Sequence, residues 1–141
     1  MTAVATEEAR RLLRIARADL AACLALLGAP GVRFANAAFH GQQAAEKALK
    51  AVLTARCADI GRTHNLVALA GQLAEAGETP PVSGDQLSLL NPYAVTLRYD
   101  DIDVELVSPQ ALREVVETVI DWAERRIAAT LNAVGDSENA E

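Results

Sequence analysis

The stretch FHGQQAAEKALK, residues 39–50, has the spacing of a helix that buries one side. At about 100° per residue, four polar side chains fall within a quarter turn of one another: Gln43, Glu46, Lys47 and Lys50. Phe39 lies in the middle of this polar face and His40 at its edge, whereas the opposite arc is apolar and rich in alanine. The stretch therefore predicts a helix that packs through one face and exposes a dense, chemically specific polar face on the other.

Apolar residues recur at three and four along most of the remaining chain, and no segment alternates with period two for long. Thr6, Thr63 and Ser108 are candidate N-caps, and Asn91-Pro92 indicates a kink or a break. The spacing predicts helices over 6–27, 32–57, 63–76, 85–97 and from Pro109 onward. We expect an all-α, up-and-down bundle of four to five helices over 6–132, followed by a disordered acidic tail over 133–141.

Charge is distributed unevenly along the 141 residues, whose net charge is −6. Residues 1–62 hold nine Lys/Arg against five Asp/Glu, which gives +4, and residues 63–141 hold four against fourteen, which gives −10. No apolar run approaches the ~20 residues of a membrane span, and the start lacks a basic region followed by an apolar core. We expect a cytoplasmic protein without a disulfide, since Cys23 and Cys57 fall at opposite ends of two antiparallel helices.

Three motifs carry a family resemblance. Gln-Gln-Ala-Ala-Glu-Lys-Ala-Leu-Lys-Ala at 42–51 is followed by Thr-His-Asn-Leu at 63–66, Arg-Tyr-Asp at 98–100 and a long last helix. In this order and spacing the chain resembles the HEPN family, the higher-eukaryote and prokaryote nucleotide-binding domain, over roughly 9–129. The family motif reads Arg-Tyr-Pro-Asp, so one position is missing here. The resemblance also implies a helical bundle.

Ribonuclease chemistry in toxic HEPN proteins uses an Arg followed by four to six residues and a His. In this sequence the motif would start at Arg98, but no His occurs after His64. The resemblance therefore implies a non-catalytic role in binding a nucleotide or a partner, often beside a separately encoded minimal nucleotidyltransferase in a toxin–antitoxin-like pair. Arg33 and His40, seven positions apart, are weak candidates for a displaced site in a metal-independent RNase toxin.

The polar face of 39–50 allows two interpretations. Its lysines could meet phosphates of a nucleotide or RNA, its glutamines could hydrogen-bond bases, and Phe39 could stack. The same face could instead be a helix–helix interface in a homodimer, and an alternative function is then a purely structural dimeric scaffold. Phe39 and Trp122, near the edges of apolar arcs, favour a dimer. We expect the nucleotide- or partner-binding residues to be Phe39, Gln42, Gln43, Glu46, Lys47, Lys50, His64, Arg98, Tyr99 and Asp100.

His64 is expected in the first turn of its helix, where the positive helix end favours a neutral imidazole. It could position a nucleotide, or it could hydrogen-bond the connector near Tyr99. The carboxylates of 100–105 could hold Mg²⁺, but a solvated acidic loop is the simpler interpretation. A stripe of arginines at 10, 14 and 17 is expected to pair with acidic neighbours. We expect neither a metal nor a cofactor.

Overall fold

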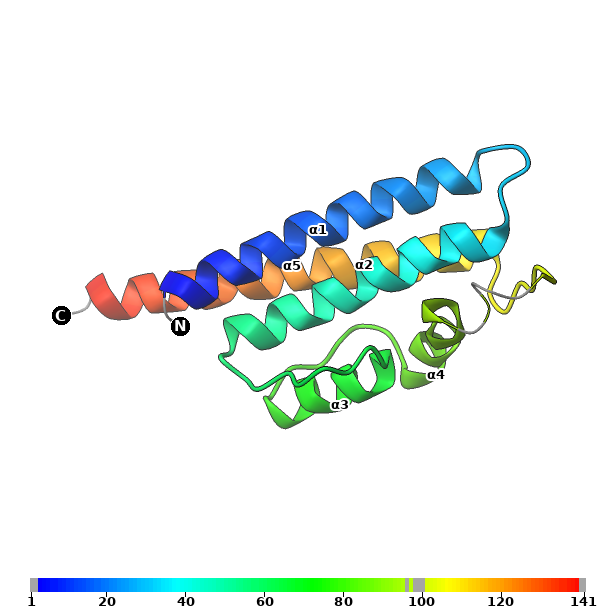
Figure 1. Ribbon diagram of the computed structural model, residues 1–141. Helices are drawn as coiled ribbons and strands as arrows, with labels where there is room; N and C mark the ends of the chain where they lie inside the picture. Colours follow the sequence, from blue (N-terminus) through cyan, green and yellow to red (C-terminus); the bar gives the residue numbers. More distant parts are fainter. Residues whose placement is uncertain (1–2, 96, 98–100, 140–141) are drawn as a thin grey trace.

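Three long helices lie side by side in the structure, a computed structural model that describes residues 3–95, 97 and 101–139 and side-chain surroundings up to 132. They are α1 (Ala3–Leu27), α2 (Phe34–Ala55) and α5 (Pro109–Asn139). Figure 1 shows that α1 and α2 run in opposite directions and that α5 runs in the direction of α2, so the start of α1 and the end of α5 lie at the same end of the bundle.

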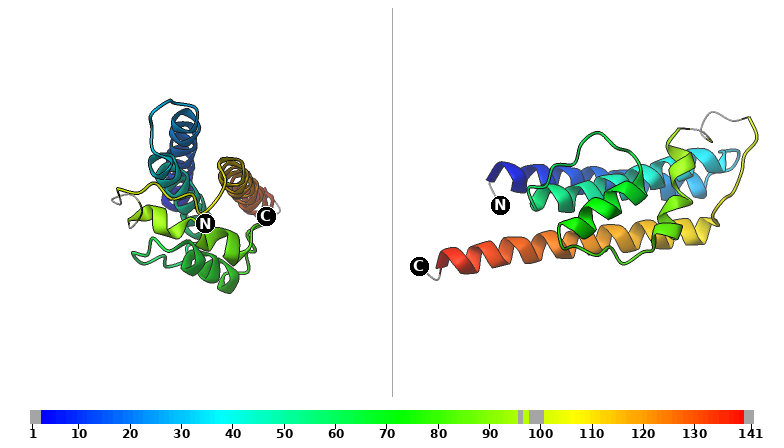
Figure 2. Two further views of the ribbon diagram at one scale, coloured as in Figure 1. Left: turned by 90° about the vertical axis from the view of Figure 1, so that its right-hand side faces the viewer. Right: turned by 90° about the horizontal axis from the view of Figure 1, so that it is seen from below.

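The alanine-rich helix α2 lies at the centre of the bundle, between the other long helices and a smaller layer of short elements (Figure 2). Small side chains let neighbouring backbones approach closely, and most of α2 is buried, including Ala38, Ala45 and Leu49. The apolar face predicted from the spacing is therefore confirmed, but burial extends well beyond that face.

At Gly41 the three long helices pack closely against one another. A Cβ atom at this position would lie 2.9 Å from Cδ1 of Leu112 on α5 and 3.4 Å from Sγ of Cys23 on α1. Both neighbours are fully buried, so any side chain at residue 41 would have to displace packed atoms.

The smaller layer consists of α3 (Leu66–Glu75), α4 (Gly84–Ser88) and the 3-10 helix η1 (Asn91–Ala94). The helix expected over 85–97 is thus broken after Ser88, because Pro92 has no N–H to continue the ladder. A capping box starts α4: Gln86 N–H donates to Ser83 Oγ, and Ser83 N–H donates to Oε1 of Gln86.

The ends of the helices agree with the sequence at some points only. Ser108 caps α5 as predicted, with its Oγ accepting from Ala111 N–H at 3.1 Å. At its other end α5 continues to Asn139. The sequence predicts a disordered tail from 133 instead. A helix that already exists is extended readily, because each added residue forms one further hydrogen bond. The domain boundary at 132 stays a prediction.

Side chains from α1 and α5 join these helices at the surface. Arg17 donates to Glu124 at 2.7 and 2.8 Å and to Asp121 at 2.9 Å. These acidic partners are what the sequence predicts for the arginine stripe of α1. Trp122 is buried on the other side of α5, so it is not the exposed aromatic residue that we expected at a dimer interface.

The prediction of an all-helical bundle is confirmed, since the described residues form five α-helices and one 3-10 helix and include no strand. None of these helices is both long enough and apolar enough to cross a bilayer. Cys23 is buried and Cys57 is exposed, and both thiols are free.

Candidate polar network around Glu46

Glu46 lies at one edge of the polar face of α2, and it is buried. Only 1% of its surface is exposed, and Gln42 is fully covered. The prediction that this face is exposed is therefore wrong at the edge that holds Glu46. The loop after α2 folds back over the helix and brings His64 onto Glu46.

The Glu46 carboxylate is surrounded by hydrogen-bond donors and ammonium groups. His64 Nδ1 lies 3.1 Å from Oε1 and 3.2 Å from Oε2, and Gln42 Nε2 donates to Oε1 at 3.3 Å. Lys50 Nζ lies 3.2 Å and Lys47 Nζ 3.6 Å from Oε2. Burial alone would raise the pKa of Glu46, but the hydrogen bond from His64 and the charges of Lys50 and Lys47 outweigh it and lower the pKa.

The paired glutamines extend this network. Lys47 Nζ donates to Gln43 Oε1 at 2.7 Å, and Gln43 Nε2 donates to Gln42 Oε1 at 2.7 Å. Gln42 Nε2 donates in turn to the carbonyl oxygen of His64 at 3.2 Å. Each amide thus uses both its oxygen and its nitrogen, which a buried amide requires.

His64 is the exposed part of the network, with 69% of its side chain accessible. An ionised carboxylate only accepts hydrogen bonds, so Nδ1 of His64 carries the hydrogen that faces Glu46. The Nε2 atom is then the nitrogen left for a partner outside the network. The backbone of His64 is held as well, because its carbonyl oxygen accepts from Gln42.

The start of α3 differs from the prediction. Thr63 is not the N-cap: its Oγ1 accepts from Asn65 N–H, and Asn65 caps the helix by accepting from Val67 and Ala68 N–H. His64 therefore precedes the helix, and the argument from the helix dipole no longer applies to it. The partner that we expected for His64 near Tyr99 lies outside the described residues.

Asn91 fixes this start of α3 against η1, a contact that the sequence did not reveal. Its Oδ1 accepts from Leu66 N–H at 2.9 Å, and its Nδ2 donates to Asn65 Oδ1 at 3.0 Å. The two asparagines together satisfy backbone groups at the helix end. The nearest sequence signal was Asn-Pro, which we used only as a sign of a break.

The acidic connector caps α2. The carboxylate of Asp103 accepts from Phe34 N–H at 2.7 Å and from Ala35 N–H at 3.0 Å. Two free N–H groups at a helix start favour such a negative charge. The hydroxyl of Tyr93 holds the same connector by donating to Val104 C=O at 2.6 Å and accepting from Leu106 N–H at 2.8 Å.

Arg33 and His40, the weak catalytic candidates, have different surroundings. Arg33 is the N-cap residue of α2 and precedes its first turn. His40 lies within α2, with Nδ1 3.2 Å from Oδ1 of Asp19 on α1 and its ring edge-on to half-buried Phe39 at 5.3 Å. His40 therefore contributes to the contact between α1 and α2.

The Arg-Tyr-Asp motif at 98–100 lies outside the described residues, so Arg98, Tyr99 and Asp100 have no structural placement here. The positions where a ribonuclease His would follow Arg98 are nevertheless described. They hold Asp103, Val104 and Glu105. The first of these is the residue that caps α2.

A second buried carboxylate, Glu78, follows α3 and was missed by the sequence analysis. Arg126 of α5 donates to it at 2.7 and 3.0 Å, and Arg56 lies 3.8 Å away. The hydrogen bond from Arg126 to Glu78 raises the pKa of Arg126. A lone Glu in a Gly-Glu-Thr-Pro turn gives no sign of burial, so only the tertiary structure could reveal this ion pair.

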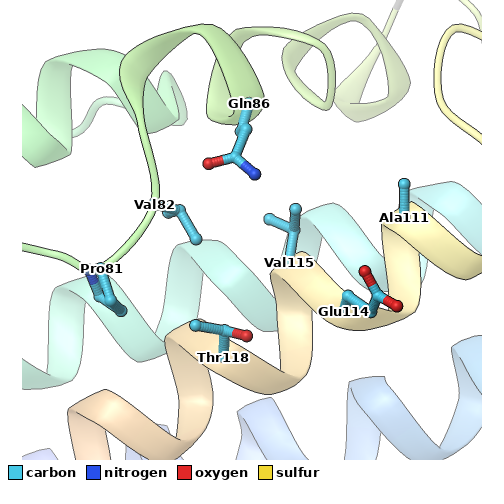
Figure 3. Close-up of a pocket in the computed structure, with 7 residues that line it drawn as sticks. All are labelled: Pro81, Val82, Gln86, Ala111, Glu114, Val115 and Thr118. Carbon is cyan, nitrogen blue, oxygen red and sulfur yellow. The ribbon is translucent and has the colours of Figure 1, made fainter.

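Figure 3 shows a hollow between the segment around α4 and α5. Its polar lining comes from Gln86, Glu114 and Thr118. Its apolar lining includes Val82 and Val115. Its volume of about 200 Å³ is below the ~300–1,000 Å³ of small-molecule sites. None of the predicted site residues lines it.

Metal binding has no support in the described residues, where no three His, Cys, Asp or Glu side chains are grouped to hold an ion. Arg, Lys and amide groups surround the buried carboxylates instead. The chemistry of the Glu46 network is therefore hydrogen bonding and charge.

The family model of the HEPN domain matches residues 9–132. This match covers most of the chain, and the protein therefore belongs to the HEPN family. No curated protein and no solved structure matches the chain significantly.

Proposed function

We propose that this HEPN protein binds a nucleotide or a partner without catalysing a reaction, at the exposed rim of the Glu46 network. As a homodimer, it would be one component of a toxin–antitoxin-like pair with a minimal nucleotidyltransferase. The observation that carries the proposal is the set of groups around one buried carboxylate: Lys47, Lys50 and His64.

The charge of this cluster favours an anionic ligand. One carboxylate faces two ammonium groups, so the lysines are not fully neutralised by Glu46. His64 is the group that a ligand meets first, because its side chain is mostly exposed while the lysines are largely covered. A phosphate at the rim would thus contact His64 and the tip of Lys47 without disturbing the buried amides.

A non-catalytic role is supported by the connector. In the positions that follow Arg98 at the ribonuclease spacing, the chain carries two carboxylates and a valine. The chain thus lacks, at these positions, the imidazole that the ribonuclease motif uses as its acid and base. Asp103 is also committed to the backbone of α2, which gives this residue a structural role.

Titration with a fluorescent ATP analogue tests the proposal. Lys47→Ala and His64→Ala should each weaken binding by roughly 5–10-fold, and more at low salt, because the phosphate contact is electrostatic. Arg125→Ala, an exposed cation elsewhere on α5, is the matched control and should leave affinity unchanged. Thermal unfolding of each variant separates lost binding from lost structure.

Two results would overturn the proposal. Saturable binding that survives both Lys47→Ala and His64→Ala would place the ligand elsewhere on the chain. Cleavage of RNA without metal, abolished by His40→Ala, would make the protein a ribonuclease and restore the Arg33/His40 pair as its site.

A further inference from the structure

The connector between η1 and α5 has an unusual surface. From residue 101 to 106 its sequence is Asp-Ile-Asp-Val-Glu-Leu, so carboxylates alternate with aliphatic side chains. None of these residues is helical, and Ile102 is 67% and Leu106 39% exposed. Large aliphatic groups at such exposure in an acidic segment are unexpected on a surface that only needs to be soluble.

Hydrogen bonds anchor residues 103–106 of this connector to the bundle. Asp103 anchors it to the first turn of α2, and the buried Tyr93 hydroxyl bridges Val104 and Leu106. The Tyr93 ring is itself fixed, edge-on to Phe34 at 5.6 Å. A segment that is ordered before binding loses less conformational entropy when a partner docks, which favours its use as a recognition surface.

Two hollows continue from this connector along the end of the bundle. The first is lined by Asp103 and Glu105 together with apolar residues of α1 and α2. The second, between the end of α1 and the start of α5, has a volume of about 430 Å³ and shares Leu27 and Pro109 with the first. Its size is in the range of sites that take large side chains or small ligands.

We infer that the connector and these two hollows form a docking surface for a cationic, aliphatic segment of a different protein chain. Lysine or arginine side chains of that segment would face Asp101 and Glu105. Its aliphatic side chains would pack on Ile102 and Leu106 and enter the hollow beside Leu27. This surface is separate from the Glu46 network, so the inference does not depend on the nucleotide site.

A second copy of this chain fits the surface less well, because most of its cations already have partners. Both lysines face Glu46. Six arginines, on α1 and α5 and at the C-cap of α2, are paired with carboxylates of the same chain: Arg11, Arg14, Arg17, Arg56, Arg113 and Arg126. Moving these cations onto the connector of another copy would break pairs that already exist.

The test uses a fluorescein-labelled synthetic peptide of leucine and lysine, about five turns of amphipathic helix in length. Fluorescence anisotropy with the full chain should give saturable binding. The variant Ile102→Ser/Leu106→Ser and the variant Asp101→Asn/Glu105→Gln should each weaken it by ~10-fold or more. A peptide in which glutamate replaces every lysine should not bind.

Matched controls distinguish the surface from general attraction to an acidic protein. Val67→Ser/Leu89→Ser removes two similarly exposed aliphatic side chains from another face, and Glu75→Gln/Asp85→Asn removes two exposed charges. Both control variants should bind the peptide like the wild type. Equal weakening by test and control variants, or no effect of the connector variants, would overturn the inference.

Sedimentation tests whether a second copy occupies the surface. Under the inference, Ile102→Ser/Leu106→Ser leaves the oligomeric state unchanged and also leaves binding of the ATP analogue unchanged. If this variant instead converts a dimer to a monomer, the occupant is a second copy and the inference is wrong. Loss of nucleotide binding in Lys47→Ala alone would bear only on the proposed function.

Discussion

His64 Nδ1 lies 3.1 Å from Oε1 of Glu46, which joins the loop after α2 to the middle of that helix. The contact covers a carboxylate that would otherwise face solvent. Two lysines and a glutamine are the other polar neighbours of this carboxylate. The loop is therefore held by an ionised group of the polar face.

Replacing this carboxylate should lower stability in a pH-dependent manner. Glu46→Gln should reduce the free energy of unfolding at pH 7 by roughly 1–3 kcal/mol, because it leaves partly covered cations without their acceptor. The folded-state pKa of Glu46 lies below the ordinary value of 4.5, so its contribution is present above that value. It is lost as the pH falls towards the lower, folded-state pKa.

Urea denaturation of wild type and Glu46→Gln between pH 7 and about pH 3 measures this contribution. The difference in stability between the two proteins should shrink as the pH falls through the acidic range. Glu75→Gln, an exposed carboxylate on α3, is the control and should track the wild type. A constant difference at every pH would show that Glu46 does not gain from being ionised.

Asp103→Ala should destabilise α2 by ~1–2 kcal/mol, since it removes the acceptor from two N–H groups at the helix start. Asp101→Ala, two positions earlier and exposed, should change stability by less than about 0.5 kcal/mol. Chemical denaturation of both variants provides the comparison. If both substitutions lowered stability equally, the negative charge of the connector would stabilise the protein, and not the cap on α2.

Tyr93→Phe should release the connector and leave the bundle folded. The substitution removes only the hydroxyl that bridges Val104 C=O and Leu106 N–H, at a cost of about 1–2 kcal/mol. Hydrogen exchange should become faster at the Leu106 amide. The amides in the middle of α2 should exchange at wild-type rates after correction for global stability, and faster exchange throughout α2 would contradict this local role.

Arg126→Ala should cost more than the loss of an exposed ion pair, because it leaves buried Glu78 with only the more distant Arg56. We expect the free energy of unfolding to fall by roughly 1–3 kcal/mol. This loss is smaller than that for a fully buried pair, because Arg126 is itself partly exposed. Arg113→Ala breaks the exposed pair with Glu117 on the same helix and should cost about 0.5 kcal/mol or less.

The double variant Glu78→Met/Arg126→Met checks the cause of that cost. If the penalty of Arg126→Ala comes from an unpaired buried charge, then removing both charges should recover much of the lost stability. Thermal unfolding of the single and double variants is sufficient for this comparison. If the double variant instead loses as much stability as the two single substitutions added together, the cost comes from lost packing.

The long helices could be predicted from the sequence because their periodicity and end signals are local. Ser108 and Pro109 defined the start of α5, and the apolar arc of α2 was correct. The start of α3 was less certain in principle, since Thr63 and Asn65 can both cap a helix. The contact with Asn91, distant in sequence, favours Asn65.

The candidate site could be predicted in part. Its members on α2 were recognised from their spacing, and His64 was recognised from its motif. A helical projection does not contain the loop that later covers the helix, so it could not show that Glu46 and Gln42 are buried. Asp103 was treated as a solvated acid for the same reason, because the N–H groups that donate to it belong to the backbone about seventy positions earlier.

The two thiols differ in exposure, so their rates of chemical modification can report how often the helical bundle opens. Cys57 is exposed, whereas Cys23 is enclosed beside Gly41, and burial raises the pKa of its thiol to about 11. An alkylating reagent should therefore modify Cys57 in the folded protein and reach Cys23 only when α1 separates from α2. The rate of this second modification would follow how often the bundle opens, without any added label.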